Sequence, residues 1–281
     1  MRAFLFAFLL LIPKAAHAQE ATNHVEFVVV IPSYNNEKWC VKNLKSVFNQ
    51  TYKHWSIYYV NDFSTDKTGE LVDSFIQKSG FKDRCTVVHN TERLNAVQNT
   101  YNAIHNIPTR KVVVMLDGDD WFAHNKVLER IAKVYADKSV WMTYGDYVQE
   151  PLKGGSCCRP FPEDVAKNLS FRSEKWIYGP VRTFYAKLFH RIKKKDLMVG
   201  GKFLKMAGDV AFMFPMLEMA SKGHIRYIKD ILYIYNVSNP INDHRINAGL
   251  QVFLERKIRA KPKYEPLDAL FSGQEALLKA Q

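Results

Sequence analysis

Three aspartates directly follow an apolar run in the segment KVVVMLDGDDW, residues 111–121. The run Val112–Leu116 is continuous and mostly β-branched, which is typical of a strand buried on both faces. Asp117, Asp119 and Asp120 come next, with a glycine between the first two that lets the backbone bend. Carboxylates this close repel one another unless one is protonated or a cation lies between them. The pattern therefore indicates a divalent cation held by oxygen ligands, the alternative being a solvated Asp/Gly turn.

The elements that must position these carboxylates follow from the periodicity of the first half of the chain. Strand-like runs alternate there with helical patterns, which predicts βαβ units, an α/β fold and a mostly parallel sheet. Ligands of such sheets bind beyond the carboxyl ends of the strands, so the residues after each strand carry the functional information. The expected strands are 26–31, 55–60, 85–89 and 112–116, and the expected helices are 39–48, 68–78 and 95–106.

The second half has a more mixed pattern. A further strand is expected at 140–144, followed by a long Pro/Gly/Cys-rich loop at 150–162. Residues 181–192 have the pattern of a helix or a strand, and 209–221 that of a strongly apolar helix. The segment 224–235 predicts two short strands.

Several nucleotide-binding classes are excluded by missing motifs. The sequence has no GxGxxG and no GxxxxGK[ST], which argues against a dinucleotide-binding domain and a P-loop NTPase. A nucleotidyltransferase would also use a metal-binding acidic pair, but it normally has a Gly-rich, basic turn after the first strand. The corresponding turn here, Pro32-Ser-Tyr-Asn-Asn36, has neither glycine nor positive charge.

The 281-residue chain is 47 % hydrophobic and has a formal net charge of +12. This size fits one large α/β domain or two small ones. The charge predicts an acidic partner such as nucleotide phosphates or anionic lipid, and so allows peripheral membrane association; a solvated basic face is the alternative. The basic excess is scattered, with dense stretches only at 191–195 and 256–263, and forms no stripe with interleaved aromatic residues, so nucleic acid is not an expected partner.

Residues 1–18 have the charged start, apolar run and A-x-A site of a signal peptide, and the run is too short to span a bilayer. Cleavage would predict the secretory pathway or an extracytoplasmic location; an uncleaved amphipathic anchor would predict a membrane-associated cytoplasmic protein. The four cysteines, Cys40, Cys85, Cys157 and Cys158, lack zinc-type spacing and are expected as buried thiols or disulfide partners.

Taken together, VVVIPSYNN, VNDFSTDKT and LDGDDW, each at a strand end, resemble the family 2 glycosyltransferases over about residues 25–145. The resemblance implies the GT-A fold, a Rossmann-like, mostly parallel twisted sheet flanked by helices, with a smaller mixed acceptor-side half. It divides the chain into a nucleotide-sugar-binding half at 19–149, an acceptor-binding half carrying the catalytic base at 150–250, and a basic C-terminal tail at 251–281.

The resemblance also implies which residues bind the donor nucleoside. In the family, the segment after the first strand and the acidic residue after the second hold the base and ribose. These positions correspond here to Pro32, Tyr34, Asn36 and Asp62, with Arg93 near the nucleotide. The acidic residue would accept a hydrogen bond from a uracil N–H, so a UDP-sugar is the expected donor.

The DxD element of the family corresponds to the aspartate cluster. By the resemblance, Asp117 and Asp119 bind the nucleotide sugar, while Asp119, Asp120 and His244 hold Mn²⁺ or Mg²⁺. Such an ion bridges the donor phosphates and neutralises the charge of the leaving diphosphate. A lone histidine on a loop is otherwise simply solvated.

Inverting members of the family use an aspartate of the second half as general base, and the matching residue is Asp209. It would take the proton from the acceptor hydroxyl during a single displacement. Gly208 stands where the family often has an acidic neighbour, and an N-cap of the following helix is the alternative role. Arg182, Lys202 and Arg245 are candidate contacts to the diphosphate.

The expected function is metal-dependent transfer of a hexose from a nucleoside-diphosphate sugar to a carbohydrate, lipid-linked or protein acceptor. The alternative is a catalytically inactive GT-A fold that binds carbohydrate or nucleotide.

Overall fold

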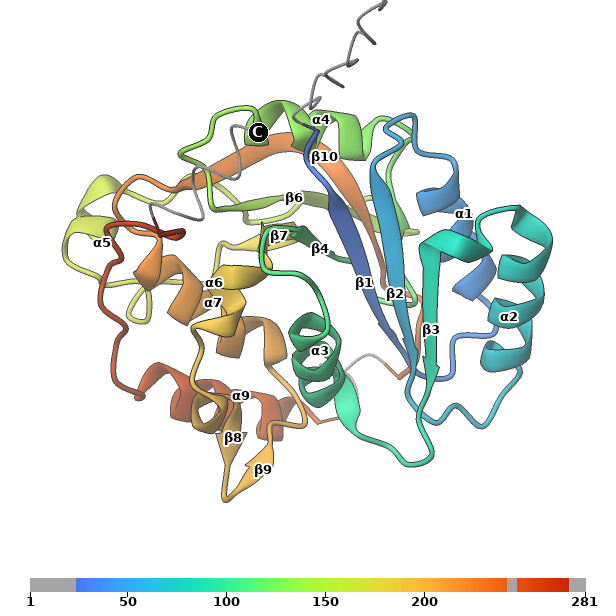
Figure 1. Cartoon of the computed structure of the whole chain (residues 1–281). Coiled ribbons are helices and arrows are strands. Elements are labelled where there is room, and N and C mark those ends of the chain that lie inside the picture. Colours follow the sequence, from blue (N-terminus) through green and yellow to red (C-terminus); the bar gives the residue numbers. More distant parts are fainter. Residues whose placement is uncertain (1–23, 242–246, 273–281) are drawn as a thin grey trace, which may run out of the picture.

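The computed structural model describes residues 24–241 and 247–272, in which helices flank one eight-stranded sheet (Figure 1). The strand order is β3-β2-β1-β4-β7-β6-β10-β5. A separate two-stranded hairpin pairs β8 with β9. This architecture confirms the predicted α/β fold with a mostly parallel sheet.

The first half contains the four predicted parallel strands and the three predicted helices. Val29, Val30 and the run Val112–Val114 are completely buried, which explains why both strands are apolar without alternation. The strands are β1 (Phe27–Ser33), β2 (Trp55–Asn61), β3 (Cys85–His89) and β4 (Val112–Met115), and the helices are α1 (Cys40–Phe48), α2 (Thr68–Ser79) and α3 (Asn95–His105), with the short η1 (Lys82–Arg84) before β3.

Strands that follow β4 in the chain extend the same sheet. β7 (Gly179–Tyr185) runs antiparallel between β4 and β6 (Met142–Glu150), and β10 (Ile225–Asn236) is parallel to β6. The two-residue β5 (Trp121–Phe122) pairs antiparallel with β10 at the edge. The sheet is therefore continuous across residue 149, where the sequence analysis places the boundary between the two halves.

The prediction of two short strands at 224–235 was wrong, because β10 is one continuous strand. Lys229 and Asp230 interrupt its apolar pattern, but they are accommodated by register shifts on either side of Ile231 rather than by a turn. The ambiguous segment 181–192 contains both elements, because β7 ends at Tyr185 and a short helix follows directly.

The remaining helices complete the molecule. Helix α4 (Val127–Tyr135) was not predicted, and the expected basic tail begins inside helix α9 (Ala248–Arg259). The predicted apolar helix is α7 (Gly208–Met219). The short elements are α5 (Glu163–Lys167), α6 (Ala186–His190), η2 (Lys194–Leu197), β8 (Met198–Val199) and β9 (Lys202–Phe203).

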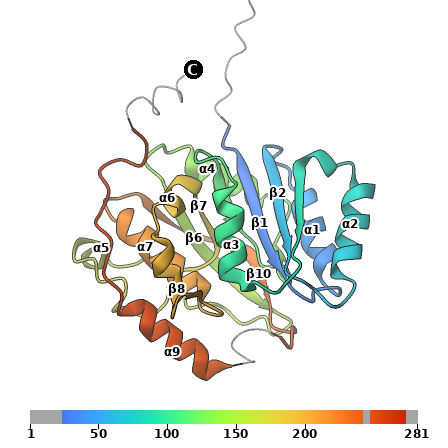
Figure 2. The same cartoon turned by 60° about the horizontal axis from the view of Figure 1, so that its bottom comes forward.

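A buried ion pair fixes helix α9 to the body of the protein. Arg172 donates to both oxygens of Glu218 on α7, at 2.6 and 2.9 Å, and its remaining Nη1 donates to the carbonyl of Ile258 on α9 at 2.7 Å. Both side chains are at most 5 % exposed. Figure 2 shows α9 lying along the edge of the molecule beside β8.

All four cysteines lie in the described part of the chain and carry free thiols, with only Cys40 fully buried.

Within residues 24–241 and 247–272, no helix has the length and apolarity needed to cross a membrane.

Candidate functional site

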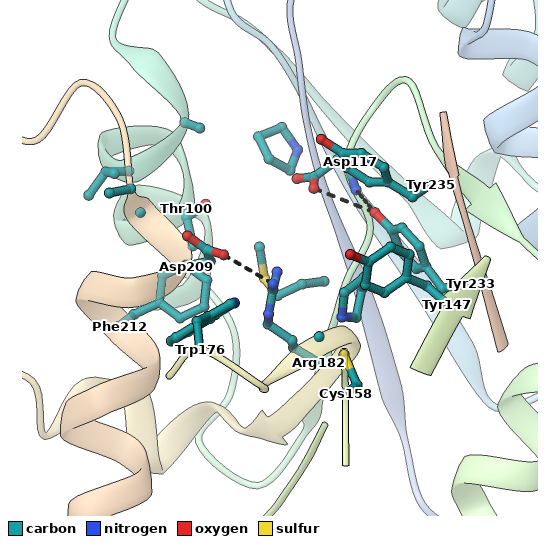
Figure 3. A pocket seen from close by; sticks show the side chains of 18 of the residues that line it. Thr100, Asp117, Tyr147, Cys158, Trp176, Arg182, Asp209, Phe212, Tyr233 and Tyr235 are labelled. Carbon is teal, nitrogen blue, oxygen red and sulfur yellow. Dashed lines mark hydrogen bonds and ion pairs between the residues drawn. The ribbon is translucent and has the colours of Figure 1, made fainter. Parts of the chain in front are cut away.

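Two adjoining cavities open at the carboxyl ends of β1 and β4. One, of about 240 Å³, is lined by aspartates and is called here the acidic cavity. The other, of about 310 Å³, has Tyr147, Trp176 and Phe212 among its walls and is called the aromatic cavity (Figure 3). Asp117 is one of four residues that line both, so the two spaces meet at the first aspartate of the cluster.

The close approach of two strand ends fixes the position of the aspartate cluster. β1 and β4 are parallel neighbours, and the amide of Gly118 donates to the carbonyl of Pro32 at 3.1 Å. A Cβ atom at position 118 would lie 2.5 Å from the side chain of Ser33. Glycine is therefore required sterically, since the turn packs directly against the end of β1.

The acidic cavity brings together eight of the residues that the sequence assigned to donor and metal binding. They lie at or after the ends of four different strands, β1 to β4, and are far apart in the chain, as expected for the carboxyl edge of a parallel sheet. They are Pro32, Tyr34, Asn36, Asp62, Arg93, Asp117, Asp119 and Asp120.

Tyr34, Arg93 and Asp62 form one contact group in this cavity. The guanidinium of Arg93 lies 3.2 Å from the centre of the Tyr34 ring, a cation–π contact, and its Nε is 3.5 Å from Asp62 Oδ2. The buried Asp62 carboxylate also accepts from the amides of Leu94 and Asn95, at 2.8 and 2.9 Å. Asp62 thus orders the loop that carries Arg93, in addition to any contact with a ligand.

The environment of Asp117 disfavours its negative charge. Its carboxyl group is open to the cavity but lies deep in the cleft. The surrounding protein and the Asp119 carboxylate raise its pKa to about 6, and the nearby Asp209 adds to the effect, while Arg182 opposes it.

Asp120 is 1 % exposed, and both of its oxygens accept hydrogen bonds from β10. The Tyr233 hydroxyl donates to Oδ2 at 2.6 Å and the Asn236 amide to Oδ1 at 2.7 Å. Burial, followed by the Asp119 and Asp117 carboxylates, raises its pKa well above the usual range. These contacts give Asp120 a clear structural role in joining the aspartate turn to β10.

The cluster fits a divalent cation in its chemistry. Its donor atoms are carboxylate oxygens, and a cation would relieve the mutual repulsion that raises the pKa values of Asp117 and Asp120. Asp119 is better placed than Asp120 to bind a cation, because it is only half-buried. Its Oδ2 accepts a hydrogen bond from the Asn239 side chain at 2.7 Å. Among the described residues, no three His, Cys, Asp or Glu side chains form a complete metal-ligand group. His244, the predicted third ligand, and Arg245 lie outside the described residues.

In the aromatic cavity, Asp209 lies in the first turn of α7. The N-cap of that helix is Ala207, so the alternative interpretation of Asp209 as the N-cap was wrong. Arg182, a predicted diphosphate contact, donates from Nη2 to Asp209 Oδ2 at 3.0 Å (Figure 3). Its Nε donates to the Tyr178 carbonyl at 3.0 Å. Lys202 lines neither cavity.

Lys205 and Asn239 are among the polar residues of the acidic cavity that were not predicted from the sequence. Asn239 follows β10, so the strand-end rule that identified the other residues also points to it. No local signal distinguishes Lys205 from the other basic residues.

The sequence profile described as Glycosyl transferase family 2 matches residues 28–195. Glycosyltransferase GlyG of Streptococcus pneumoniae serotype 4 is 25 % identical over 222 residues, which are 74 % of this chain and 69 % of GlyG.

Two solved structures share the fold at lower identity. The S. aureus TarS 1–349 complex with UDP-GlcNAc has a TM-score of 0.60 at 17 % identity, covering 79 % of this chain and 60 % of TarS 1–349. The mannosyltransferase PcManGT from Pyrobaculum calidifontis, in complex with GDP-Man and Mn²⁺, has a TM-score of 0.56 at 20 % identity, covering 86 % of this chain and 66 % of PcManGT.

Proposed function

Because the chain belongs to the family 2 glycosyltransferases, we propose that it transfers a hexose from a UDP-sugar to an acceptor hydroxyl, with inversion, in a single displacement. The observation that carries the proposal is the position of Asp117 in the walls of both cavities. A donor in the acidic cavity and an acceptor in the aromatic cavity would meet at this residue, and holding two reactants in register is a large part of catalysis.

The acidic cavity would hold the donor nucleotide. Tyr34 and Arg93 supply a ring and a cation for the base and its phosphates. Asp62 Oδ1 already accepts from Asn90 and Leu94, so a base N–H would be accepted by Oδ2, which the Asn95 amide and, at 3.5 Å, Arg93 Nε also approach. UDP is bound in a TarS structure and GDP-Man in PcManGT, so the fold accommodates either base. The preference for uracil rests on Asp62.

The metal ion would be held by Asp119, with Asp120 and His244 as the other predicted ligands. When bound, Mn²⁺ or Mg²⁺ supplies the positive charge that neutralises the diphosphate leaving group. The protein's own contribution is to hold these carboxylates at the end of a rigid buried strand.

Asp209 would act as the general base. The helix dipole of α7 favours a negative charge in its first turn, and Arg182 fixes the direction of the carboxylate. Oδ1, the oxygen not bound by Arg182, accepts from the Val210 amide at 2.9 Å, and its other lone pair would accept the proton of the acceptor hydroxyl. The aromatic walls suit the apolar face of a sugar ring, so a carbohydrate acceptor fits best.

The decisive experiment is calorimetric titration of the full chain with UDP and with GDP, each with and without Mn²⁺. We expect metal-dependent binding of UDP in preference to GDP. If neither nucleotide bound under any metal condition, the donor-site proposal would be rejected. Binding without turnover on any sugar acceptor would favour the alternative of an inactive binding module. For an active enzyme, NMR of the product's anomeric configuration tests inversion.

A further inference from the structure

The positive charge of the protein is concentrated in two chain segments. Residues 191–205 contain six Lys or Arg and one Asp, and residues 251–263 contain five Lys or Arg and one Glu. Their net charges, +5 and +4, account for +9 of the total of +12. The two regions around the dense stretches named in the sequence analysis therefore hold most of the net positive charge.

Folding joins these two segments into one surface. The Lys261 ammonium donates to the carbonyls of Lys195, Asp196 and Met198, at 3.1, 2.8 and 3.0 Å. Tyr264 adds a second link, because its hydroxyl donates to Asp196 Oδ2 at 2.6 Å. Figures 1 and 2 show β8 and α9 side by side in both views.

The exposed cations of this surface, called here the basic face, are not neutralised by its carboxylates. Asp196 is engaged by Tyr264, and Glu255 pairs with Arg259 at 2.7 Å. The basic face consists of nine exposed side chains: Arg191, Lys193, Lys194, Lys195, Lys202, Lys205, Arg256, Lys257 and Lys263.

Helix α9, which contributes Arg256 and Lys257 to the basic face, also carries exposed apolar side chains beside these cations. Val252 is 48 % and Phe253 50 % exposed, and each stands one helical turn before a cation, Arg256 and Lys257 respectively. The opposite side of the helix buries Leu254 and Ile258 against the protein. The outward face thus combines apolar tips with cations, which is the composition of a helix that lies in a membrane interface.

We propose that the basic face is a docking surface for an anionic phospholipid bilayer. Lipid headgroups complement the nine cations, and the acyl boundary accommodates Val252 and Phe253. A nucleic acid would match the charge but would not account for an exposed aliphatic residue beside the aromatic one, since bases stack on rings. The basic face adjoins the two cavities of the candidate site, because Lys205 lines the acidic cavity and Gln251 of α9 lines the aromatic cavity. Delivery of a lipid-linked acceptor would follow, and only this consequence rests on the proposed function.

The test is flotation of the full chain with vesicles of phosphatidylcholine alone and with roughly one-third phosphatidylglycerol, at low salt. We expect the partition coefficient to be much higher on the anionic vesicles. The triple variant Lys195→Gln/Arg256→Gln/Lys263→Gln should lower it by roughly 100-fold, at about fivefold per charge. These three side chains make no hydrogen bond or ion pair with the described residues, so the variant should fold normally, as circular dichroism will verify.

The matched control, Lys78→Gln/Lys82→Gln/Lys138→Gln, removes the same charge from exposed sites on other elements and should bind like the unaltered protein. Phe253→Ser should weaken binding to anionic vesicles without changing the salt dependence. Equal partition onto neutral and anionic vesicles, or equal losses in the basic-face and control variants, would refute the proposal. So would binding of single-stranded RNA that depends on the three cations while vesicles are not bound. The assay needs neither donor nor acceptor, so its failure is distinct from failure of the transferase proposal.

Discussion

At the scale of single residues, the proposed mechanism assigns metal binding to Asp119 and proton removal to Asp209. The two residues line different cavities. Replacing Asp209 with Asn keeps its size and its contact with Arg182 but removes the proton acceptor. We expect donor binding to persist and the turnover number to fall by about 10²–10⁴-fold, the usual contribution of a general base. The measurement is UDP affinity by calorimetry together with steady-state transfer rates. Asp83→Asn, at an exposed site, is the control, and full activity of Asp209→Asn would remove Asp209 from the mechanism.

Replacing Asp119 or Asp120 with alanine should affect different properties of the protein, ligand binding in the first case and stability in the second. Asp119→Ala should abolish metal-dependent UDP binding with little change in unfolding free energy. Asp120→Ala leaves the Tyr233 hydroxyl and the Asn236 amide without their acceptor, so it should lower the unfolding free energy by about 2–4 kcal/mol. Denaturant unfolding and calorimetry on both variants separate the two roles. Equal stability of the two proteins would contradict the structural role of Asp120.

This difference shows how far local pattern predicts a site. Pro32, Asp62 and Asp117 each follow a strand, so their meeting at one sheet edge was predictable from sequence alone. The role of Asp120 was not, because its partners on β10 are 113 and 116 residues away in the chain. The pairing of Arg182 with Asp209 was equally hidden, since neither residue carries a signal that points to the other.

At the scale of elements, Arg172 determines where helix α9 lies. Removing one partner of a buried pair leaves an uncompensated charge, so Arg172→Met should lower the unfolding free energy by about 3–5 kcal/mol. The double variant Arg172→Met/Glu218→Leu removes both charges and should be more stable than the single variant. Denaturant unfolding of the four proteins of this cycle gives the coupling free energy. A double variant less stable than Arg172→Met would show that the contact of Glu218 with the Tyr264 amide matters more than charge.

Element prediction succeeded where one periodicity ran uninterrupted, as in β1 to β4 and α1 to α3. It failed at β10, because the sequence pattern of two polar residues in a bulge is the same as that of a turn. It also failed at α9, because the many basic residues leave no clear apolar periodicity around the buried Leu254 and Ile258. In both segments tertiary packing, rather than local pattern, determines the structure.

At the scale of the whole molecule, donor binding should stabilise the fold, because the acidic cavity draws its walls from the ends of β1, β2, β4 and β10. A ligand that binds only the folded state, present at about 100 times its dissociation constant, adds about 2.7 kcal/mol to the unfolding free energy. We therefore expect UDP with Mn²⁺ to raise the thermal midpoint by several degrees, and UMP with Mn²⁺ to raise it less, since UMP lacks the second phosphate. The Asp119→Ala protein provides the internal control, because its midpoint should not respond to the metal. If UDP raised the midpoint equally with and without Mn²⁺, in both proteins, the nucleotide would bind independently of a metal and the carboxylate cluster would need another explanation.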